Sequence, residues 1–377
     1  MRILHVGGAG YGFAFLRDLH RGGHNGNNRS ACECSCYFGA AVTGSTTSTL
    51  KTTKVSSTTI STRTTTGSGP TSTATDACGT PDFNLYGYGA GTTGGGSATP
   101  VTVTSCSALL TAVDNAMSAG PSVTEISGTL SGCGIIDLGS DITIVGVGAS
   151  SGLTGGGFRI KESSNVIIRN LVFHDAPESY DQIQLNYATY VWIDHCDFSS
   201  DGIVGDKDYY DGLVDITHAS DFVTLSWNKL HDHWKADLIG HSDNNGAEDT
   251  GHLRVTEHHN YWNNVNSRTP SIRFGTAHIY SSCFTNIPTS GIDCRENAEV
   301  LVEQNYFSNV TLAIATDIES DVGGYATDLN NIYADSSTTE ITQVGSVTPP
   351  YKYVLDEASC VCDFLDKYAG TGVVTGL

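Results

Sequence analysis

A segment of about eight residues recurs through the middle of the chain, and it restricts the possible folds more than any other feature. Each full copy starts with Val, alternates as a strand does, and ends on a large apolar residue. The full copies are 166–173, 191–198, 223–230, 255–262 and 300–307, and a shorter copy occupies 278–284. Successive copies start 25, 32, 32, 23 and 22 residues apart, a spacing typical of structural units that stack on one another.

The sequence between the copies indicates how these units connect. No amphipathic pattern of helix length separates them, which excludes a sheet built from β-α-β units. The sixth position holds Asn228, Asn260 and Asn305 in three copies and Leu171, Cys196 and Cys283 in the others. Stacked side-chain amides can hydrogen-bond along such a column. The sequence therefore predicts an all-β fold, a single-stranded right-handed parallel β-helix.

The region before the repeats divides into two parts. Residues 43–77 are almost entirely Ser and Thr and cannot bury a core, so we expect a disordered, O-glycosylated linker. Residues 1–42 form an atypical segment with no recognisable fold: it begins as a poor signal peptide, and Cys32, Cys34 and Cys36 have no matching second half of a motif. The β-helix domain is expected over 78–377.

The charge balance excludes several classes of partner. The chain has 19 basic and 40 acidic residues and a net charge of −21. Nucleic-acid-binding proteins and polybasic membrane-binding proteins need a positive face, so neither class is expected. No run of eighteen apolar residues occurs, so no membrane span is predicted. We expect a monomer.

Cysteine usage indicates the compartment. Eleven cysteines, together with the Ser/Thr tract, indicate an oxidising environment and disulfide bonds, and hence a secreted, extracellular protein. Asn28 and Asn309 begin N-x-Ser/Thr sequons, which fits a glycoprotein. Because the number of cysteines is odd, at least one lacks an intramolecular partner, and the spacing does not fix the pairing.

Charged residues concentrate in the connections between the repeats. Asp181 precedes the second copy, a long connection carries Asp201, Asp206, Asp208, Asp211 and Asp215, and Lys235, Arg268 and Arg273 follow in later connections. Insertions at the same phase of successive solenoid turns gather on one face. We therefore expect these groups to share a groove.

The residue types in this groove suggest its chemistry. Asp181, Asp211 and Asp215 offer carboxylate oxygens to a hard cation, and Ca²⁺ fits them better than Zn²⁺ does. Aspartates are also common as ordinary turn residues, and that reading stays open on spacing alone. Lys235, Arg268 and Arg273 beside a cation suit an anionic polymer whose carboxylates bridge the metal and pair with basic side chains.

Two motifs carry a family resemblance: Trp-Ile-Asp-His at 192–195 and Arg-x-Pro-x-x-Arg-x-Gly at 268–275. With surrounding segments such as YVWIDHCDF and NSRTPSIRFGTAH, they resemble the fungal and bacterial pectate lyases. The likeness runs from about Cys78 to the C-terminus, roughly four-fifths of the chain. It implies a parallel β-helix that binds Ca²⁺ and cleaves polygalacturonate (pectate) of the plant cell wall by β-elimination.

The resemblance also assigns roles by position in the motifs. It implies Asp181, Asp211 and Asp215 as calcium ligands, Lys235 and Arg273 as groups that hold substrate carboxylates, and Arg268 as the Brønsted base that removes the C5 proton. Asp211 stands where the bacterial enzymes often have Glu, and Ser179 where they have a further acid. Trp192, Asp194 and His195 match a signature that we interpret as structural.

An arginine base needs a physical justification, because the reference pKa of arginine is above 12. Neighbouring cations favour the neutral guanidine by repulsion, and a bound Ca²⁺ acidifies the C5 proton by withdrawing charge from the uronate carboxylate. Both effects predict an alkaline optimum.

Three alternatives remain. A pectin lyase acts on methyl-esterified chains without calcium, which the three aspartates disfavour. A hydrolytic polygalacturonase needs paired carboxylates for acid and base catalysis, and the chain has no vicinal Asp-Asp. A non-catalytic β-helix that only binds polysaccharide would not need Arg268.

Overall fold

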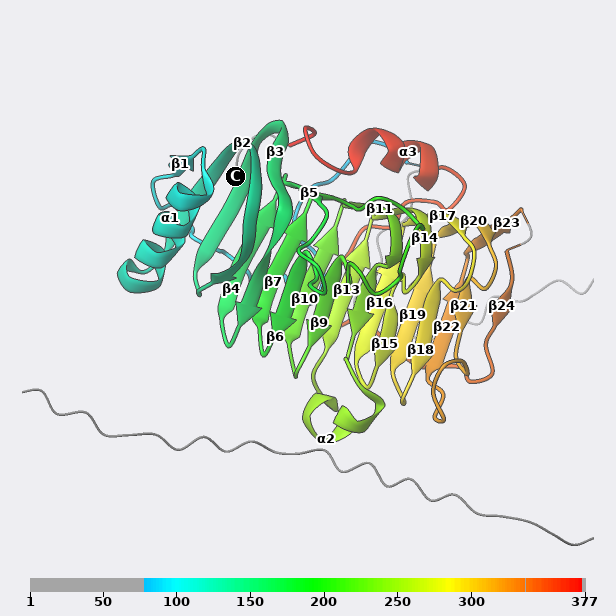
Figure 1. The fold of residues 1–377 in the computed structure, drawn as a ribbon. Coiled ribbons are helices and arrows are strands. Elements are labelled where there is room, and N and C mark those ends of the chain that lie inside the picture. The colour runs from blue at the N-terminus through cyan, green and yellow to red at the C-terminus, as the bar shows by residue number, and fades with distance from the viewer. Residues whose placement is uncertain (1–77, 336, 375–377) are drawn as a thin grey trace, which may run out of the picture. The chain divides into compact units, whose positions relative to one another are not determined.

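The described part of the computed structural model, residues 78–335 and 337–374, is a parallel β-helix of about ten turns (Figure 1). The fold predicted from the repeats is therefore confirmed. The segments predicted over 1–42 and 43–77 lie outside the described residues, so their organisation stays a prediction.

Each turn of the β-helix contributes one strand to each of three parallel sheets. β2 (Ser122–Leu138) and β3 (Ile142–Lys161) are long enough to run through all three. The other strands of sheet I are β1 (Val101–Val103), β4 (Ser164–Arg169), β7 (Thr189–Asp194), β10 (Asp221–Ser226), β13 (Arg254–His258), β16 (Thr276–Tyr280), β19 (Glu299–Glu303) and β22 (Tyr325–Leu329).

Sheets II and III follow in the same order. Sheet II contains β5 (Val172–His174), β8 (Asp197–Ser199), β11 (Lys229–Lys235), β14 (Tyr261–Ser267), β17 (Cys283–Ile287), β20 (Tyr306–Val310) and β23 (Ile332–Ala334). Sheet III contains β6 (Ile183–Asn186), β9 (Val214–Thr217), β12 (Asp237–Ile239), β15 (Ser271–Arg273), β18 (Ile292–Arg295), β21 (Ile314–Ala315) and β24 (Thr339–Glu340).

The core is a set of apolar rows along the helix axis. Val191, Val223 and Val255 align in register from β7 through β10 to β13, and all three are fully buried. The large residues that end the repeats stack in sheet II: the rings of Phe284 and Phe307 lie 4.6 Å apart at 13°. Each such aromatic pair contributes about 0.5–1.5 kcal/mol beyond the apolar area that it buries.

The turn from sheet I to sheet II carries the predicted asparagine ladder, with one correction. Oδ1 of Asn260 accepts hydrogen bonds from the backbone and side-chain amides of Asn228 at 3.0 and 3.1 Å. The shorter copy starts at Ala277 rather than His278, because Ala277 pairs with both Val255 and Val300. Ser282 therefore takes the ladder position that we had assigned to Cys283, and Asn331 extends the ladder by one further turn.

Two helices lie against the β-helix, and the sequence did not indicate either. α1 (Cys106–Ala119) packs at the β1 end of the stack and buries Leu109, Val113 and Ala116 (Figure 1). α3 (Val361–Tyr368) covers part of the side with Phe364 and Leu365. Two short pieces, η1 (Asp243–Asn245) and α2 (Gly246–Asp249), lie in the connection between β12 and β13.

The predicted disulfide bonds are present in the described residues. Cys78 pairs with Cys360, Cys106 with Cys133, and Cys283 with Cys362, whereas Cys196 and Cys294 are free and buried. Within the same part of the chain, no helix is long and apolar enough to cross a membrane.

Candidate functional site

The predicted site residues lie at the end of β11 in sheet II, in the connections from sheet II to sheet III, and on the strands of sheet III. Asp181 precedes β6, Asp211 precedes β9, and Asp215 lies on β9. Lys235 ends β11, Arg268 lies between β14 and β15, and Arg273 ends β15. The β-helix brings the charges of Asp181, Asp211, Asp215, Lys235 and Arg268 close enough to act on one another.

Asp181 and Asp215 form the centre of the acidic group. The backbone N–H of Gly212 donates to Asp181 Oδ1 at 2.6 Å, and Gln184 Nε2 donates to Asp181 Oδ2 at 2.8 Å. Asp215 Oδ1 is shielded from solvent and has no hydrogen-bond partner among the described residues. A Cβ atom at Gly212 would collide with Oδ1 of both aspartates, so glycine lets the two oxygens converge.

The electrostatics of this pair favour a bound cation. Burial, followed by the charge of Asp211, raises the pKa of Asp181 to about 6. Burial, followed by the charge of Asp181, raises the pKa of Asp215 well above its usual range. Asp181 is buried and Asp215 is half-buried, and two such carboxylates that repel each other while one oxygen lacks a donor are stabilised when a cation binds between them.

Asp211 is placed differently from the other two acids. Its side chain is 46% exposed, and its Oδ1 pairs with Lys235 Nζ at 2.9 Å. Lys235 Nζ also donates to Asp208 Oδ1 at 2.8 Å. Although burial opposes the charge of Lys235, its hydrogen bonds with Asp208 and Asp211 outweigh this effect and raise its pKa. The charged ammonium group of Lys235 is therefore fixed in position by Asp208 and Asp211.

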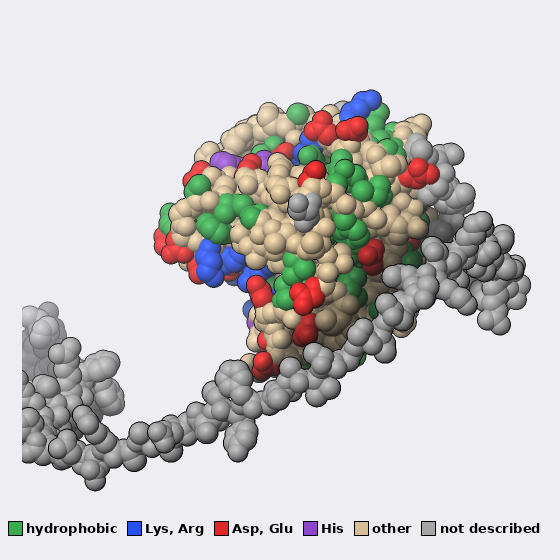
Figure 2. All heavy atoms as spheres, turned by 90° about the vertical axis from the view of Figure 1, so that its right-hand side faces the viewer, with side chains coloured by type: hydrophobic (Ala, Val, Ile, Leu, Met, Phe, Trp, Pro, Cys, Tyr) green, Lys and Arg blue, Asp and Glu red, His purple; other side chains and the backbone are tan. Residues whose placement is uncertain are grey.

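The two arginines of the second motif differ in their partners. Arg273 donates from Nε to Asp243 Oδ1 and from Nη1 to the carbonyl of Gly240 at 2.7 Å. Arg268, with φ at 62°, makes no side-chain hydrogen bond or ion pair with residues 78–335 or 337–374. Its charge nevertheless acts on Asp215 and Lys235. Lys and Arg side chains gather beside a hollow in the molecular surface (Figure 2).

The family of the chain is decided by its match to a protein-family model. A family model described as pectate lyase matches residues 71–374. The chain belongs to the pectate lyase family.

Individual relatives of this pectate lyase agree with the assignment. The chain is 45% identical to pectate lyase A of Aspergillus niger over 296 residues, which cover 76% of this chain and 87% of the relative. It is 48% identical to "probable pectate lyase A" of Aspergillus fumigatus over 237 residues, covering 62% and 71% of the two chains. The protein is therefore a polysaccharide lyase.

Solved structures give the same fold. The pectate lyase of Bacillus sp. N165 in complex with trigalacturonate matches with a TM-score of 0.71 and 30% identity, covering 77% of this chain and 99% of that chain. Pectate lyase II of Xanthomonas campestris matches with a TM-score of 0.67 and 28% identity, covering 77% and 98%.

The Trp-Ile-Asp-His signature of this pectate lyase lies in the core. Ser226 Oγ accepts from Trp192 Nε1 at 2.8 Å and donates to Asp194 Oδ1 at 2.7 Å. Asp194 Oδ2 accepts from Arg169 and from His195 Nδ1, each at 2.7 Å. His195 is completely buried, so the structural interpretation of the signature fits its surroundings.

Sequence analysis missed His233, which holds the long connection 200–213 at both ends. His233 Nε2 donates to the carbonyl of Asp211 at 2.8 Å, and its Nδ1 lies 2.8 Å from Ser200 Oγ, which also donates to the carbonyl of Asp232 at 2.8 Å. Burial lowers the pKa of His233 to about 4, so the imidazole is neutral at neutral pH. Its position two residues before Lys235 was the available signal.

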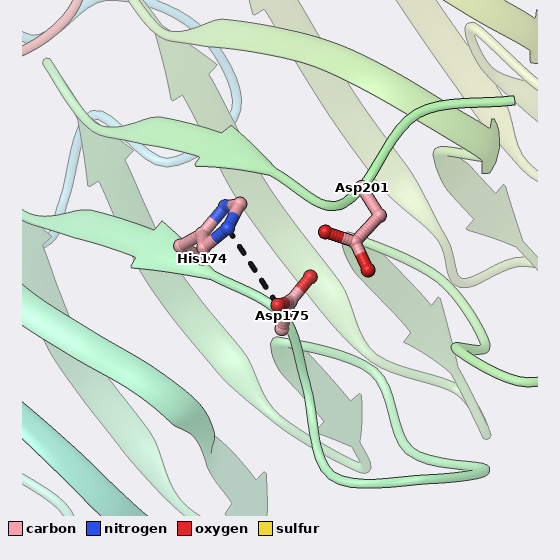
Figure 3. Close-up of side chains that lie close together, drawn as sticks. All are labelled: His174, Asp175 and Asp201. Carbon is pink, nitrogen blue, oxygen red and sulfur yellow. Dashed lines mark ion pairs between the residues drawn. The ribbon is translucent and has the colours of Figure 1, made fainter. Parts of the chain in front are cut away.

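A second group of acids and imidazole lies at the start of the same connections (Figure 3). Ligand atoms of His174, Asp175 and Asp201 all lie within 4.8 Å of one another, which those of Asp181, Asp211 and Asp215 do not. His174 Nε2 lies 3.6 Å from Asp175 Oδ2, and Asp201 is exposed. Asp201 was the only member named from the sequence, because the strand register that sets His174 opposite Ser199, two residues before Asp201, is not visible there.

Proposed function

We propose that this pectate lyase is a secreted enzyme that cleaves α-1,4-linked polygalacturonate by calcium-dependent β-elimination, with Arg268 as the base. The free guanidinium of Arg268 carries this proposal. Lys235 and Arg273 are both bound to acids, whereas Arg268 has no partner among the described residues and faces the charge field of Asp215. A base must be free to approach the proton that it removes.

Asp181 and Asp215 would hold the calcium ion, and Asp211 would join them when it turns from Lys235. Carboxylate oxygens are the ligands that Ca²⁺ prefers, and Asp215 Oδ1 lacks any other partner within the described chain. When bound, Ca²⁺ supplies Lewis-acid polarisation of the uronate carboxylate and so acidifies C5.

The three basic residues have separate roles in the proposed reaction. Lys235 and Arg273 pair with substrate carboxylates and orient the sugar ring. Arg268, in its neutral guanidine form, takes the proton from C5, the electron pair forms the C4=C5 double bond, and the C4–O bond breaks. The leaving oxygen takes a proton from water, and the hydroxide that remains takes the proton from Arg268. The products are a 4,5-unsaturated oligogalacturonide and a chain with a free 4-hydroxyl group.

Lysine and arginine at the substrate-binding positions also favour pectate over esterified pectin. A methyl ester removes the negative charge with which Lys235 and Arg273 pair, and an uncharged ester is a poor bridge to a cation between Asp181 and Asp215. Pectin lyase activity is therefore not favoured.

We extend the proposal to cellular location and assembly. Three disulfide bonds suit an oxidising extracellular environment. Asn309 of the second sequon is exposed on β20, which suits a glycosylation site. We propose that the protein acts as a monomer on plant cell-wall pectate, without nucleic-acid or membrane partners.

One assay tests the activity and its metal requirement. The protein is incubated with polygalacturonate, with calcium or with a chelator, and the ultraviolet absorbance of the C4=C5 double bond is followed. We expect an absorbance increase that the chelator abolishes and added calcium restores. New reducing ends without absorbance would indicate a hydrolase, and neither signal would indicate a binding protein.

A further inference from the structure

Two acidic side chains, Asp237 on β12 and Glu257 on β13, lie inside the β-helix. Glu257 is in register with Leu225 on β10 and Ile279 on β16, and Asp237 is in register with Val214 on β9. These three neighbours belong to the apolar core. Residues in register on adjacent strands point to the same side of the sheet. Both carboxyl groups therefore face the interior, and both residues are 0% exposed.

The pair has no partner except itself. No N–H or O–H donor within residues 78–335 or 337–374 reaches any of the four carboxyl oxygens. The two carboxyl groups instead act on each other's protonation. Ionised carboxylates only accept hydrogen bonds, so a bond between them requires at least one proton.

The charged groups around Asp237 and Glu257 do not neutralise the negative charge that either acid would carry if it ionised. On β11, Lys235 is bound to Asp208 and Asp211. Asp215, on the outer face of β9, has the same sign of charge as Asp237 and repels it. The elements packed beside Glu257, β10 and β16, present apolar side chains in its row. No cation in the described part of the chain forms an ion pair with either acid.

Other basic groups nearby are also engaged elsewhere or contribute only backbone atoms. His233 of β11 binds Ser200 and the carbonyl of Asp211. Arg268 offers its carbonyl, which accepts from the backbone N–H of Asp237 at 2.9 Å.

The surroundings of Asp237 and Glu257 raise the pKa of both carboxyl groups. Burial raises the pKa of Glu257 to about 8. Burial, followed by the charge of Glu257, raises the pKa of Asp237 well above its usual range. A charged form of either acid would stand in the apolar core without a counter-ion, which is costly.

We infer that Asp237 and Glu257 form a hydrogen-bonded pair of carboxylic acids in the core, and that this pair makes the folded protein progressively less stable as the pH rises. The released protons go to solvent, and they leave mainly from the unfolded chain, where both acids ionise freely.

The direction in which stability changes with pH follows from the number of protons that the folded and unfolded chains hold. Below about pH 4, the reference range of carboxyl groups, the folded and unfolded chains both hold the two protons. Above it the unfolded chain releases them while the folded chain keeps them. Each retained proton then shifts the unfolding equilibrium about tenfold toward the unfolded state per pH unit, until the folded pKa is reached.

The test compares unfolding midpoints of the full chain at pH 5 and pH 8. The variant Asp237→Asn/Glu257→Gln keeps the shape and a hydrogen bond but cannot titrate. We expect the Tm of the wild type to fall between these pH values by at least about 5 °C more than the Tm of this variant. Parallel falls in both proteins would overturn the inference.

A surface control separates this effect from net charge. Asp114→Asn/Glu340→Gln removes the same two charges at exposed positions, and its Tm should follow the wild type at both pH values. An equal benefit from this control would also overturn the inference. If the amide variant does not fold, Glu257→Leu restores the apolar row, and it should show about half of the improvement because Asp237 still titrates.

Discussion

At the scale of single residues, Arg268 has the most specific proposed role. We expect Arg268→Ala to lower kcat about 10²–10⁴-fold, the contribution of a positioned base, because no other unpaired base lies beside Asp215 among the described residues. Binding of trigalacturonate should persist, since Lys235 and Arg273 still pair with its carboxylates. Initial rates from ultraviolet absorbance and calorimetric titration with trigalacturonate measure the two effects.

Arg159 provides the matched control for this substitution. It lies in the sheet III part of β3, in register with Gln184, and donates from Nε to Asp137 at 2.6 Å. Arg159→Ala should leave kcat within about twofold, because exposed ion pairs contribute little. Near-normal turnover by Arg268→Ala, or an equal loss in the control, would refute the assignment of Arg268 as the base.

Asp215 should show opposite effects on stability with and without metal. In chelator, Asp215→Asn removes one of two charges that repel each other, so we expect Tm to rise by about 2–4 °C. The rise in Tm that calcium produces in the wild type should shrink, because binding to the folded state stabilises it in proportion to affinity. Thermal scans with calcium or chelator measure both, and a lower Tm in chelator would contradict the repulsion.

Asp181 gives the corresponding pH dependence of the chelated protein. Its pKa is raised from 3.8 to about 6, a change of about two units, or ~3 kcal/mol. Because the folded pKa is raised, this contribution to stability is fully present below about pH 4 and is lost as the pH rises to 6. In chelator, the Tm of the wild type should therefore be lower at pH 6.5 than at pH 4.5. The Tm of Asp181→Asn should fall less between these two pH values. Equal pH dependence in the two proteins would count against this.

At the scale of elements, connection 200–213 carries two acids that bind Lys235, and His233 fixes its two ends. His233→Ala removes both hydrogen bonds. We expect kcat/KM to fall about tenfold and calcium affinity, measured by calorimetry, to weaken. Ser200→Ala removes the bonds of Ser200 Oγ to His233 and to the carbonyl of Asp232 but keeps the bond from His233 to Asp211, so it should have a smaller effect on calcium affinity. Equal calcium affinity in wild type and His233→Ala would show that His233 does not position Asp211.

Elements also show how far the sequence predicts this structure. The Val-initiated repeat specifies strands, stacking and the common phase of Asp181, Lys235 and Arg268, because each turn repeats the same local pattern. The engagement of Lys235 by Asp211 and of Arg273 by Asp243 was not predicted. These contacts depend on how connections 200–213 and 240–253 fold back, and the repeat period carries no information about that.

Two further misses have different causes. α1 covers the end of the stack, where the repeat template no longer applies, and it was hidden by the overall strand composition. Glu257 occupies the third position of its copy, where the other full copies have Ile168, Ile193, Leu225 and Val302. An acid at an apolar position of a repeat was a visible signal, and the strand register gives it meaning by aligning Glu257 with Leu225 and Ile279.

At the scale of the whole molecule, the disulfide bond between Cys78 and Cys360 ties together positions 282 residues apart. Cys106 and Cys133, in contrast, are 27 residues apart. In the chain-entropy account, a cross-link stabilises by restricting the unfolded chain, and the effect grows with the logarithm of the closed loop. We therefore expect Cys78→Ser/Cys360→Ser to lower the free energy of unfolding by about 3–5 kcal/mol, and more than Cys106→Ser/Cys133→Ser does.

Denaturant unfolding of the two double variants measures this difference directly. The long cross-link also joins the start of the described chain to the residue that precedes α3, whose Phe364 packs on Trp227. Its loss should therefore expose α3 to exchange before the strands of sheet III, and lyase activity at low temperature should persist because the site lies on other elements. Greater destabilisation by the Cys106–Cys133 variant would show instead that local closure of the α1 end, and not the length of the loop, governs stability.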